Sequence, residues 1–262
     1  MNLDTVKIGF IGFGNMASAM ADGWIASGAV LAENMCACAA RFDALKSRCE
    51  ERGMYAFEDA AAVIEAVDVV VVAVKPYMIE RVLGPVAQLL ADKVVLSVAA
   101  GWDCEAYERV IPGTRHLSTV PNTPVAINEG VIACEKASTL TEGDHDLVFA
   151  LLDLLGTPVE VETHLLSVAG TVGGCSPAFI AMVIEALADA AVKHGIPRAT
   201  AYPMVSQMMV GTAKLQLATG MHPGAMKDAI CSPGGTTIRG VAELEAAGMR
   251  SAFIRAIDAI EG

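Results

Sequence analysis

The strongest constraint on the fold is a glycine-rich motif that directly follows the first apolar segment of the chain. Residues 7–11 (KIGFI) have the character of a short strand, and residues 12–17 (GFGNMA) come next. This is the GxGxxA form of the dinucleotide fingerprint, in which Gly12 allows a tight turn, Gly14 lets a pyrophosphate approach the backbone, and Ala17 lets helix and strand pack closely. Because the motif lies between a strand and a helix rich in small residues, it predicts a Rossmann-type domain.

The end of the second predicted strand bears on which nicotinamide cofactor binds. A strand over residues 35–39 leads into Ala40 and Arg41, where an NAD-specific site usually carries an acidic residue for the ribose 2′-hydroxyl. An arginine at this point suits a 2′-phosphate, so Arg41 favours NADPH over NADH. The alternative is that Arg41 is solvated and simply opens the next helix, and Asp43 lies nearby, so NADH stays the alternative cofactor.

A continuous β-branched segment marks the centre of the predicted sheet. Residues 69–74 (VVVVAV) are typical of a parallel strand covered on both faces, and Lys75 and Pro76 end it. Ligands bind at the carboxyl edge of such a sheet, so Lys75 is placed to contact cofactor phosphate or ribose; the alternative is that it lies at the mouth of the site without contact. Asn122, in a rigid Pro-Asn-Thr-Pro turn, is a candidate to reach the nicotinamide pocket. The predicted cofactor-binding residues are Gly12, Gly14, Asn15, Met16, Ala17, Arg41, Ala73, Val74, Lys75, Pro76 and Asn122.

Strands and helices alternate through the first part of the chain, which predicts an α/β fold with a doubly wound sheet over residues 1–162. Further segments fit this pattern: strands at 94–98, 115–119, 130–134 and 158–161, and an amphipathic helix over 141–155. After Glu162 the strands stop, and residues 163–262 are predicted to form a separate, all-α domain.

Two long apolar helices are expected in this second domain. Ser176 and Pro177 form an N-cap and first-turn pair, which predicts a helix from there to about His194. Residues 195–197 (GIP) interrupt the pattern before a second helix that ends near Thr219. Both helices are too apolar for a surface in water, so we expect them at an interface between subunits.

A second glycine-rich loop lies near the end of the chain. Residues 231–237 (CSPGGTT) combine a Ser-Pro turn, two glycines and two threonines ahead of a pattern of helical period. A helix that begins here presents unpaired backbone N–H groups beside hydroxyls, and the N–H groups and the helix dipole both favour an anion. The alternative is an ordinary helix cap, but a second anion-binding loop at the other end of the chain favours a ligand site.

Composition argues against several other classes of partner and site. The chain has 262 residues, a formal net charge of −12 and no basic run, which disfavours nucleic acid and anionic membranes. No apolar run approaches the roughly 20 residues needed to span a bilayer, so we expect no membrane segment. Seven scattered cysteines without a CxxC pair, and five histidines far apart in sequence, give no support for a metal site and indicate a reduced, cytoplasmic protein.

Over essentially its whole length, the chain resembles the pyrroline-5-carboxylate reductase family. The matching segments are residues 11–17, 73–76, 121–124, 177–179, 185–190, 222–224, 227–228, 232–237 and 244–245, of which 232–237 (SPGGTT) is the most specific. The resemblance implies an N-terminal Rossmann domain, a helical C-terminal domain for substrate binding and dimerisation, and often a ring of dimers. It also implies NAD(P)H-dependent reduction of 1-pyrroline-5-carboxylate to L-proline, the last step of proline biosynthesis.

The resemblance assigns roles within the SPGGTT loop. It implies that the substrate carboxylate rests on Ser232 and on the amides of Gly235 and Thr236. The expected catalytic residue is Thr237, whose hydroxyl hydrogen-bonds the ring nitrogen. The expected substrate-binding residues are Ser232, Gly234, Gly235, Thr236 and Thr237. A cyclic imine with a positive nitrogen accepts hydride readily, so catalysis is mostly positioning, and no catalytic histidine or paired carboxylate is required.

Two segments depart from the family pattern and leave alternatives open. Residues 173–176 (GGCS) stand where the family usually has Ser-Gly-Ser-Gly, and residues 220–221 (GM) stand where a glutamate often precedes the His-Pro turn. A related cyclic imine as substrate, or weaker activity, therefore stays open. A 3-hydroxyacid dehydrogenase would need a Lys-x-x-x-Asn pair, yet no asparagine follows Asn128. A non-catalytic NADP-binding regulatory protein would be indicated by a broken substrate loop, but residues 232–237 are intact.

Overall fold

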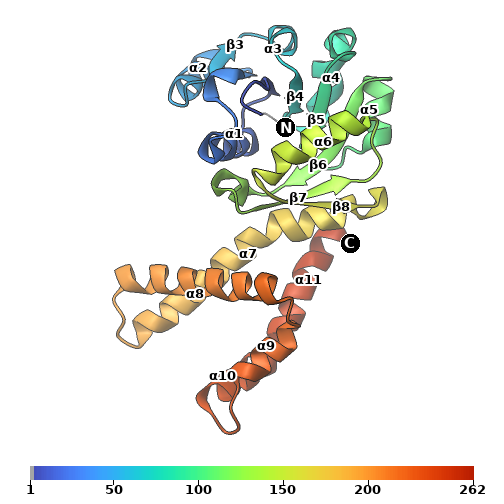
Figure 1. The fold of residues 1–262 in the computed structure, drawn as a ribbon. Helices are drawn as coiled ribbons and strands as arrows, with labels where there is room; N and C mark the ends of the chain where they lie inside the picture. Colours follow the sequence, from blue (N-terminus) through green and yellow to red (C-terminus); the bar gives the residue numbers. More distant parts are fainter. Residues whose placement is uncertain (1–2) are drawn as a thin grey trace. The chain divides into compact units, whose positions relative to one another are not determined.

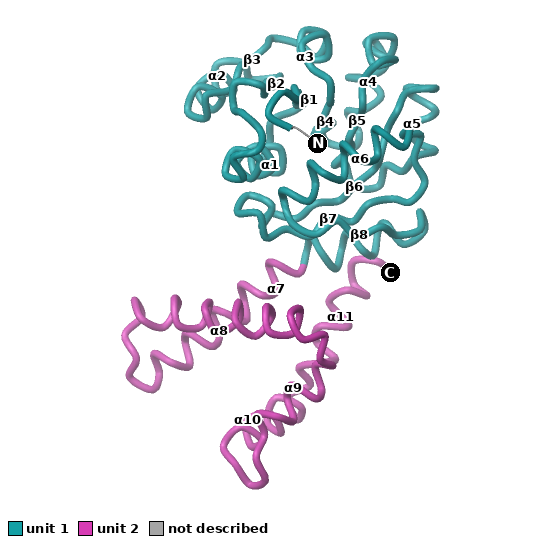
Figure 2. The backbone as a smooth tube through the Cα atoms, viewed as in Figure 1, with its two compact units in different colours: residues 1–175 teal, residues 176–262 magenta. Residues whose placement is uncertain are grey.

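The computed structural model describes residues 3–262, and the chain divides into two compact units, residues 1–175 and 176–262 (Figure 2). The predicted domain boundary after Glu162 lies earlier, where the last strand has ended and a helical segment begins at Thr163. That boundary stays a prediction about the organisation of the chain.

The first unit contains one sheet of eight strands in the order β3-β2-β1-β4-β5-β6-β7-β8 (Figure 1). All neighbouring strands are parallel except β6 and β7. The order β3-β2-β1-β4-β5-β6 is that of dinucleotide-binding sheets, and it confirms the predicted α/β fold class. The strands are β1 (Ile8–Ile11), β2 (Met35–Cys38), β3 (Tyr55–Phe57), β4 (Val69–Val72), β5 (Val94–Ser97), β6 (Arg115–Pro121), β7 (Gly130–Glu135) and β8 (Gly156–Val161).

Helices cover both faces of this sheet, because successive residues of each strand point to opposite faces. Val69 and Val71 of β4 belong to the apolar cluster on one face, and Val70 and Val72 belong to the cluster on the other. All four are fully buried, as predicted for a central strand. The helices are α1 (Asn15–Ser27), α2 (Phe42–Glu50), α3 (Ala60–Ala66), α4 (Ile79–Leu83), α5 (Cys104–Val110) and α6 (Glu142–Asp153), with short 3-10 helices η1 (Ala32–Asn34), η2 (Pro76–Met78), η3 (Gly84–Leu90), η4 (Thr123–Ile127) and η5 (Thr163–Leu165).

A capping box fixes the start of α6. Thr141 Oγ1 accepts from the Asp144 amide at 3.2 Å, and Asp144 Oδ2 accepts from the Thr141 amide at 3.2 Å. Arg115 Nη1 on β6 donates to Asp144 Oδ1 at 2.9 Å. Burial raises the pKa of Asp144, but hydrogen bonds from Thr141 and the charge of Arg115 outweigh it, and the pKa falls below its ordinary value.

Replacing Asp144 with alanine should lower the free energy of unfolding by about 1–3 kcal/mol at neutral pH, the range for a lost helix cap and charge-assisted hydrogen bond. Because the folded-state pKa is lowered, this stabilisation is present above the unfolded-state pKa and is lost as pH falls through the folded-state pKa. Denaturant unfolding at neutral pH and at a pH well below ~4 measures the difference, since the unfolded carboxyl titrates at about 4 and the folded one lower still. Asp146→Ala, at an exposed position of α6, is the control. A difference between parent and Asp144→Ala that persists undiminished in acid would contradict this account.

Two predicted elements differ from the structure. Strand β3 was not predicted, because it is only three residues long and its first residue, Tyr55, is exposed at the edge of the sheet. The first long helix, α7 (Leu166–Lys193), does not begin at Ser176 and Pro177 as predicted but ten residues earlier, and Pro177 lies inside it. Proline has no N–H, so it removes the bond to the carbonyl four residues before it, that of Gly173.

The side chain of Asn122 compensates for that missing bond. Asn122 Nδ2 donates to the Gly173 carbonyl at 3.0 Å, so the carbonyl that Pro177 leaves without a helical donor is satisfied. Asn122 Oδ1 in turn accepts from the Val131 amide at 3.0 Å, which fixes the orientation of the side-chain amide. Because Asn122, which directly follows β6, supplies this donor, the helix continues through the proline.

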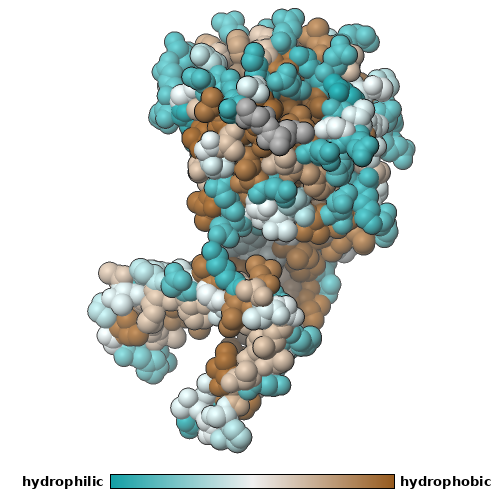
Figure 3. All heavy atoms as spheres, viewed as in Figure 1, coloured by the Kyte–Doolittle hydropathy of each residue, from teal (hydrophilic) through white to brown (hydrophobic). Residues whose placement is uncertain are grey.

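The remaining helices belong to the second unit and follow the predicted order. They are α8 (Arg198–Thr219), α9 (Pro223–Ile230), α10 (Thr236–Ala246) and α11 (Met249–Glu261). The buried apolar cluster among the described residues of this unit is small and contains Ala188, Ala201 and Val205. Apolar side chains lie exposed instead, among them Met182 and Leu217, and Figure 3 displays apolar surface along these helices.

One helical segment, Thr163–Lys193, is long and apolar enough to cross a membrane by length and composition alone. The expectation that no segment reaches this length was wrong, because glycines and alanines extend the apolar stretch without a run of large side chains. Core helices of proteins outside membranes can have the same length and composition.

Candidate functional site

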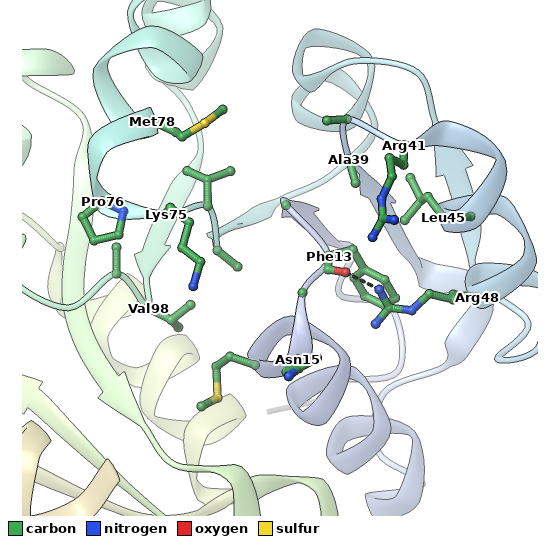
Figure 4. Close-up of a pocket in the computed structure, with 18 of the residues that line it drawn as sticks. Phe13, Asn15, Ala39, Arg41, Leu45, Arg48, Lys75, Pro76, Met78 and Val98 are labelled. Atoms are coloured by element: carbon green, nitrogen blue, oxygen red, sulfur yellow. Dashed lines mark hydrogen bonds between the residues drawn. The ribbon is translucent and has the colours of Figure 1, made fainter. Parts of the chain in front are cut away.

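A cleft of about 880 Å³ opens at the carboxyl edge of the sheet, within the first unit. It lies where β1, β2, β4 and β5 end, at the point where the strand order reverses, which is where ligands bind in open α/β sheets. Figure 4 shows side chains from the glycine loop, α2 and the loop after β4 around this space. The lining residues are Gly12, Phe13, Gly14, Asn15, Met16, Ala39, Ala40, Arg41, Ala44, Leu45, Arg48, Ala73, Val74, Lys75, Pro76, Met78, Val98, Ala99, Ala100 and Thr123.

The two glycines of the first loop serve different purposes. Gly12 has φ +91°, and a Cβ there would lie 2.8 Å from the Ala73 carbonyl oxygen, so both backbone conformation and space require glycine. Gly14 has an ordinary extended conformation, and a Cβ there would meet no atom within 4 Å. The space beside Gly14 is therefore open, as close approach of a ligand to the backbone would need.

The cleft is electropositive within an acidic chain. Arg41 and Arg48 lie on one wall and Lys75 on the other, and the first turn of α1, which Gly14 caps, contains no acidic residue (Figure 4). None of the described residues that line the cleft is acidic. Free N–H groups at a helix start together with three cations suit a ligand that carries several phosphates. These residues fit a dinucleotide with an additional 2′-phosphate.

Most predicted cofactor-binding residues line this cleft, namely Gly12, Gly14, Asn15, Met16, Arg41, Ala73, Val74, Lys75 and Pro76. Ala17 does not line it and is fully buried in the core. Asn122 also lies outside the lining, and its side chain makes the bonds to Gly173 and Val131 described above. That Asn122 contacts the nicotinamide stays a prediction, which would use the second N–H or the second lone pair of its amide.

Three polar or aromatic members of the site were not predicted from the sequence: Phe13, Arg48 and Thr123. A signal for Arg48 was present, because Arg41, Ala44, Leu45 and Arg48 recur at the spacing of one helix face and all line the cleft. Phe13 occupies a variable position of the fingerprint, where the motif alone carries no information.

The second glycine loop does open a helix, as predicted. Helix α10 begins at Thr236, and Gly235 is its N-cap, without a side-chain hydrogen bond to the cap. Gly234 has φ +68°, and a Cβ on Gly235 would lie 2.4 Å from Ser232 Oγ. The Ser232 hydroxyl therefore lies against the start of the helix, next to N–H groups that no side-chain cap occupies. The binding roles of Ser232, Gly234, Gly235, Thr236 and Thr237 stay predictions.

The departure at residues 220–221 has a local explanation. Gly220 ends α8 in the left-handed conformation with φ 62°, and its N–H donates to the Gln216 carbonyl at 2.8 Å. Glycine is the residue best suited to this helix end.

The strand order, the glycine loop and the cationic cleft define a Rossmann-type dinucleotide-binding protein. Residues 163–261 match the model of the pyrroline-5-carboxylate reductase dimerisation domain, and residues 7–101 match that of the NADP oxidoreductase, coenzyme F420-dependent, family. The pyrroline-5-carboxylate reductase of Treponema pallidum is 40% identical over 97% of this chain and 98% of its own length. The chain belongs to the pyrroline-5-carboxylate reductase family.

Two further comparisons agree with this assignment. The pyrroline-5-carboxylate reductase of Escherichia coli is 39% identical over 96% of this chain and 94% of its own length. A crystal structure of pyrroline carboxylate reductase from Plasmodium falciparum, solved with NADP bound, superposes with a TM-score of 0.88 at 25% identity and covers 98% of this chain and 96% of that one. The resemblance stated from the sequence is thus confirmed at the level of the family and the fold.

Proposed function

We propose that this chain reduces 1-pyrroline-5-carboxylate to L-proline with NADPH. The observation that carries the proposal is the cationic cleft at the glycine loop, in a chain that matches reductases of this name along nearly its whole length. Arg41 and Lys75 support NADPH as the cofactor, with NADH as the alternative. The intact loop of residues 232–237 supports a catalytic protein over a regulatory NADP-binding one.

The proposed chemistry requires mainly that two molecules be held in position. When bound, NADPH would supply a hydride to the imine carbon and be left as NADP+, and the electron pair of the carbon–nitrogen π bond would pass to the ring nitrogen. The glycine loop and the start of α1 hold the pyrophosphate. The start of α10, with Ser232, holds the substrate carboxylate, and the Thr237 hydroxyl orients the ring nitrogen. No residue of the chain needs to form a covalent bond.

We further propose that the helical unit forms a homodimer, and that dimers can assemble into a ring. The match of residues 163–261 to a dimerisation model and the exposed apolar side chains of α7 and α8 support the dimer. The same interface accounts for the apolar character of Thr163–Lys193 without a membrane. The described cysteines are all free, which supports the predicted cytoplasmic location.

Consumption of NADPH with 1-pyrroline-5-carboxylate, followed by absorbance and by detection of proline, tests the function. Turnover with this imine is expected. If NADPH binds but neither this imine nor its homologue with the next larger ring is reduced, the enzymatic proposal fails and the regulatory alternative takes its place.

Replacing Arg41 with alanine should raise the KM for NADPH far more than the KM for NADH. The change should be about 10-fold or more, the scale of a lost charge-assisted hydrogen bond to the 2′-phosphate. Arg109→Ala is the matched control, since Arg109 is an exposed arginine of α5 paired with Glu105 outside the cleft. An unchanged preference between the two cofactors would remove the proposed phosphate role of Arg41.

A further inference from the structure

Arg48 joins α2 to the turn between β1 and α1. Its Nη1 donates to the Phe13 carbonyl at 2.6 Å, and its Nη2 donates to Ser18 Oγ (Figure 4 shows the first bond). Ser18 Oγ donates in turn to the Gly14 carbonyl at 2.9 Å, and the Ser18 amide donates to the same carbonyl at 3.0 Å. One guanidinium thereby restrains two consecutive peptides of the glycine loop, that between Phe13 and Gly14 and that between Gly14 and Asn15.

An aromatic ring packs against the same guanidinium, and a neighbouring ion pair holds the backbone of Arg48. Its Cζ lies 5.1 Å from the centroid of the Phe13 ring, which is 4% exposed and packs edge-on to Phe10. Arg52, in the turn just after α2, donates to the Arg48 carbonyl at 3.0 Å and to both carboxylate oxygens of Asp22 on α1 at 2.7 and 3.0 Å. Arg48 is thus the centre of a bracket between α1 and α2, built from Phe13, Ser18, Asp22, Arg48 and Arg52.

The bracket matters because glycine peptides rotate easily. Glycine has more backbone freedom than any other residue type, so a loop that contains Gly12 and Gly14 would sample several peptide orientations if it were unrestrained. A trans peptide is planar, and its C=O and N–H point in opposite directions. Fixing the carbonyls of Phe13 and Gly14 therefore fixes the N–H groups of Gly14 and Asn15, beside the open space at Gly14. A loop with its carbonyls turned toward that space would repel a phosphate.

We propose that Arg48 is a positioning residue of the cofactor site, which holds the Phe13–Gly14 and Gly14–Asn15 peptides ready for the pyrophosphate of either nicotinamide dinucleotide. The proposal rests on the proposed cofactor role of the cleft. The proposal gives two arginines different roles: Arg41, at the N-cap of α2, discriminates between NADPH and NADH, whereas Arg48, within α2, supports both equally, because both cofactors carry the pyrophosphate.

Two variants separate positioning from charge. Arg48→Met removes both the charge and the guanidinium N–H donors. Arg48→Lys keeps the charge but lacks the planar guanidinium that donates to two acceptors at once. The dissociation constants of NADPH and NADH should rise by about 10-fold or more, and by the same factor for both cofactors, in Arg48→Lys as well as in Arg48→Met. Hydrogen–deuterium exchange without cofactor should be faster in the loop of residues 12–18 in both variants.

The binding titrations and melting temperatures are measured alongside Arg109→Met, which removes an exposed arginine of the same unit outside the cleft. Parental affinity in Arg48→Lys would overturn the proposal in favour of a charge effect, and a loss confined to NADPH would overturn it in favour of a 2′-phosphate contact. Should either Arg48 variant fail to fold, Ser18→Ala removes one arm of the bracket and is expected to weaken both cofactors equally; unchanged binding there would count against the proposal. If the parent chain binds neither cofactor, the failure lies with the proposed cofactor site itself.

Discussion

Alanine at Gly12 is expected to lower the melting temperature and to abolish measurable cofactor binding, whereas alanine at Gly14 is expected to weaken binding alone. Gly12 has φ +91°, and its Cβ would lie 2.8 Å from the Ala73 carbonyl oxygen. Strain of this kind costs about 1–3 kcal/mol, which corresponds to several degrees in the melting temperature of a unit of this size. The turn and the segment after β4 that contains Ala73 would both have to shift, and both line the cleft.

The Gly14→Ala variant serves as the matched comparison, because its Cβ would project into open space. Its free energy of unfolding without cofactor should equal that of the parent within about 1 kcal/mol, the cost of an ordinary surface substitution, so its melting temperature should change little. Its affinity for NADPH should fall about 10-fold or more, since the methyl group occupies the space of the pyrophosphate. Calorimetric melting and equilibrium titration measure both effects. If Gly14→Ala binds NADPH with the affinity of the parent, the pyrophosphate does not lie against the backbone of Gly14.

Replacing Thr237 with alanine is expected to lower kcat about 10-fold or more, the scale of one hydrogen bond made in the transition state. Thr237 is the second residue of α10, so alanine keeps the backbone N–H groups that are proposed to hold the carboxylate. The KM for the imine should therefore change less than kcat. Steady-state kinetics with 1-pyrroline-5-carboxylate at saturating NADPH measures both constants.

Thr237→Ser is the matched control, because it keeps the hydroxyl and removes only a methyl group. It should retain kcat within about 3-fold, as expected for a loss below 1 kcal/mol. Thr212→Ala, which removes an exposed hydroxyl bonded to its own helix at the Met208 carbonyl, should leave both constants unchanged. Equal kcat in Thr237→Ala and the parent would show that this hydroxyl is not the partner of the imine nitrogen.

The features that the sequence predicted well are those that local physics determines. The turn at Gly12 needs a positive φ, the strand at Val69–Val72 needs burial on both faces, and α10 needs a start at which no side chain blocks the N–H groups. Each of these appears as a residue type at a fixed spacing. The family resemblance then assigned a ligand to each glycine loop, which composition and periodicity could not do, and those roles stay predictions.

The features that were missed depend on contacts between distant residues. Pro177 has the local signature of a helix start, and only the bond from Asn122 to the Gly173 carbonyl explains why the helix passes through it. Arg48 lies 35 residues from the Phe13 carbonyl that it bonds, so its role could not be read from the fingerprint alone. Three-residue strands such as β3 carry too few side chains to produce a periodic signal.

The composition of the second unit bears on how its stability depends on protein concentration. Its buried apolar cluster consists of Ala188, Ala201 and Val205 among the described residues, while large side chains such as Leu217 face outward. A helical unit with so small a buried apolar cluster gains stability from the surface that packs against it. When that surface belongs to a second copy of the chain, the fraction of folded unit depends on protein concentration by mass action. Dilution would then destabilise this unit as warming does, while the sheet, which contains its own packed interior, does not depend on concentration in this way.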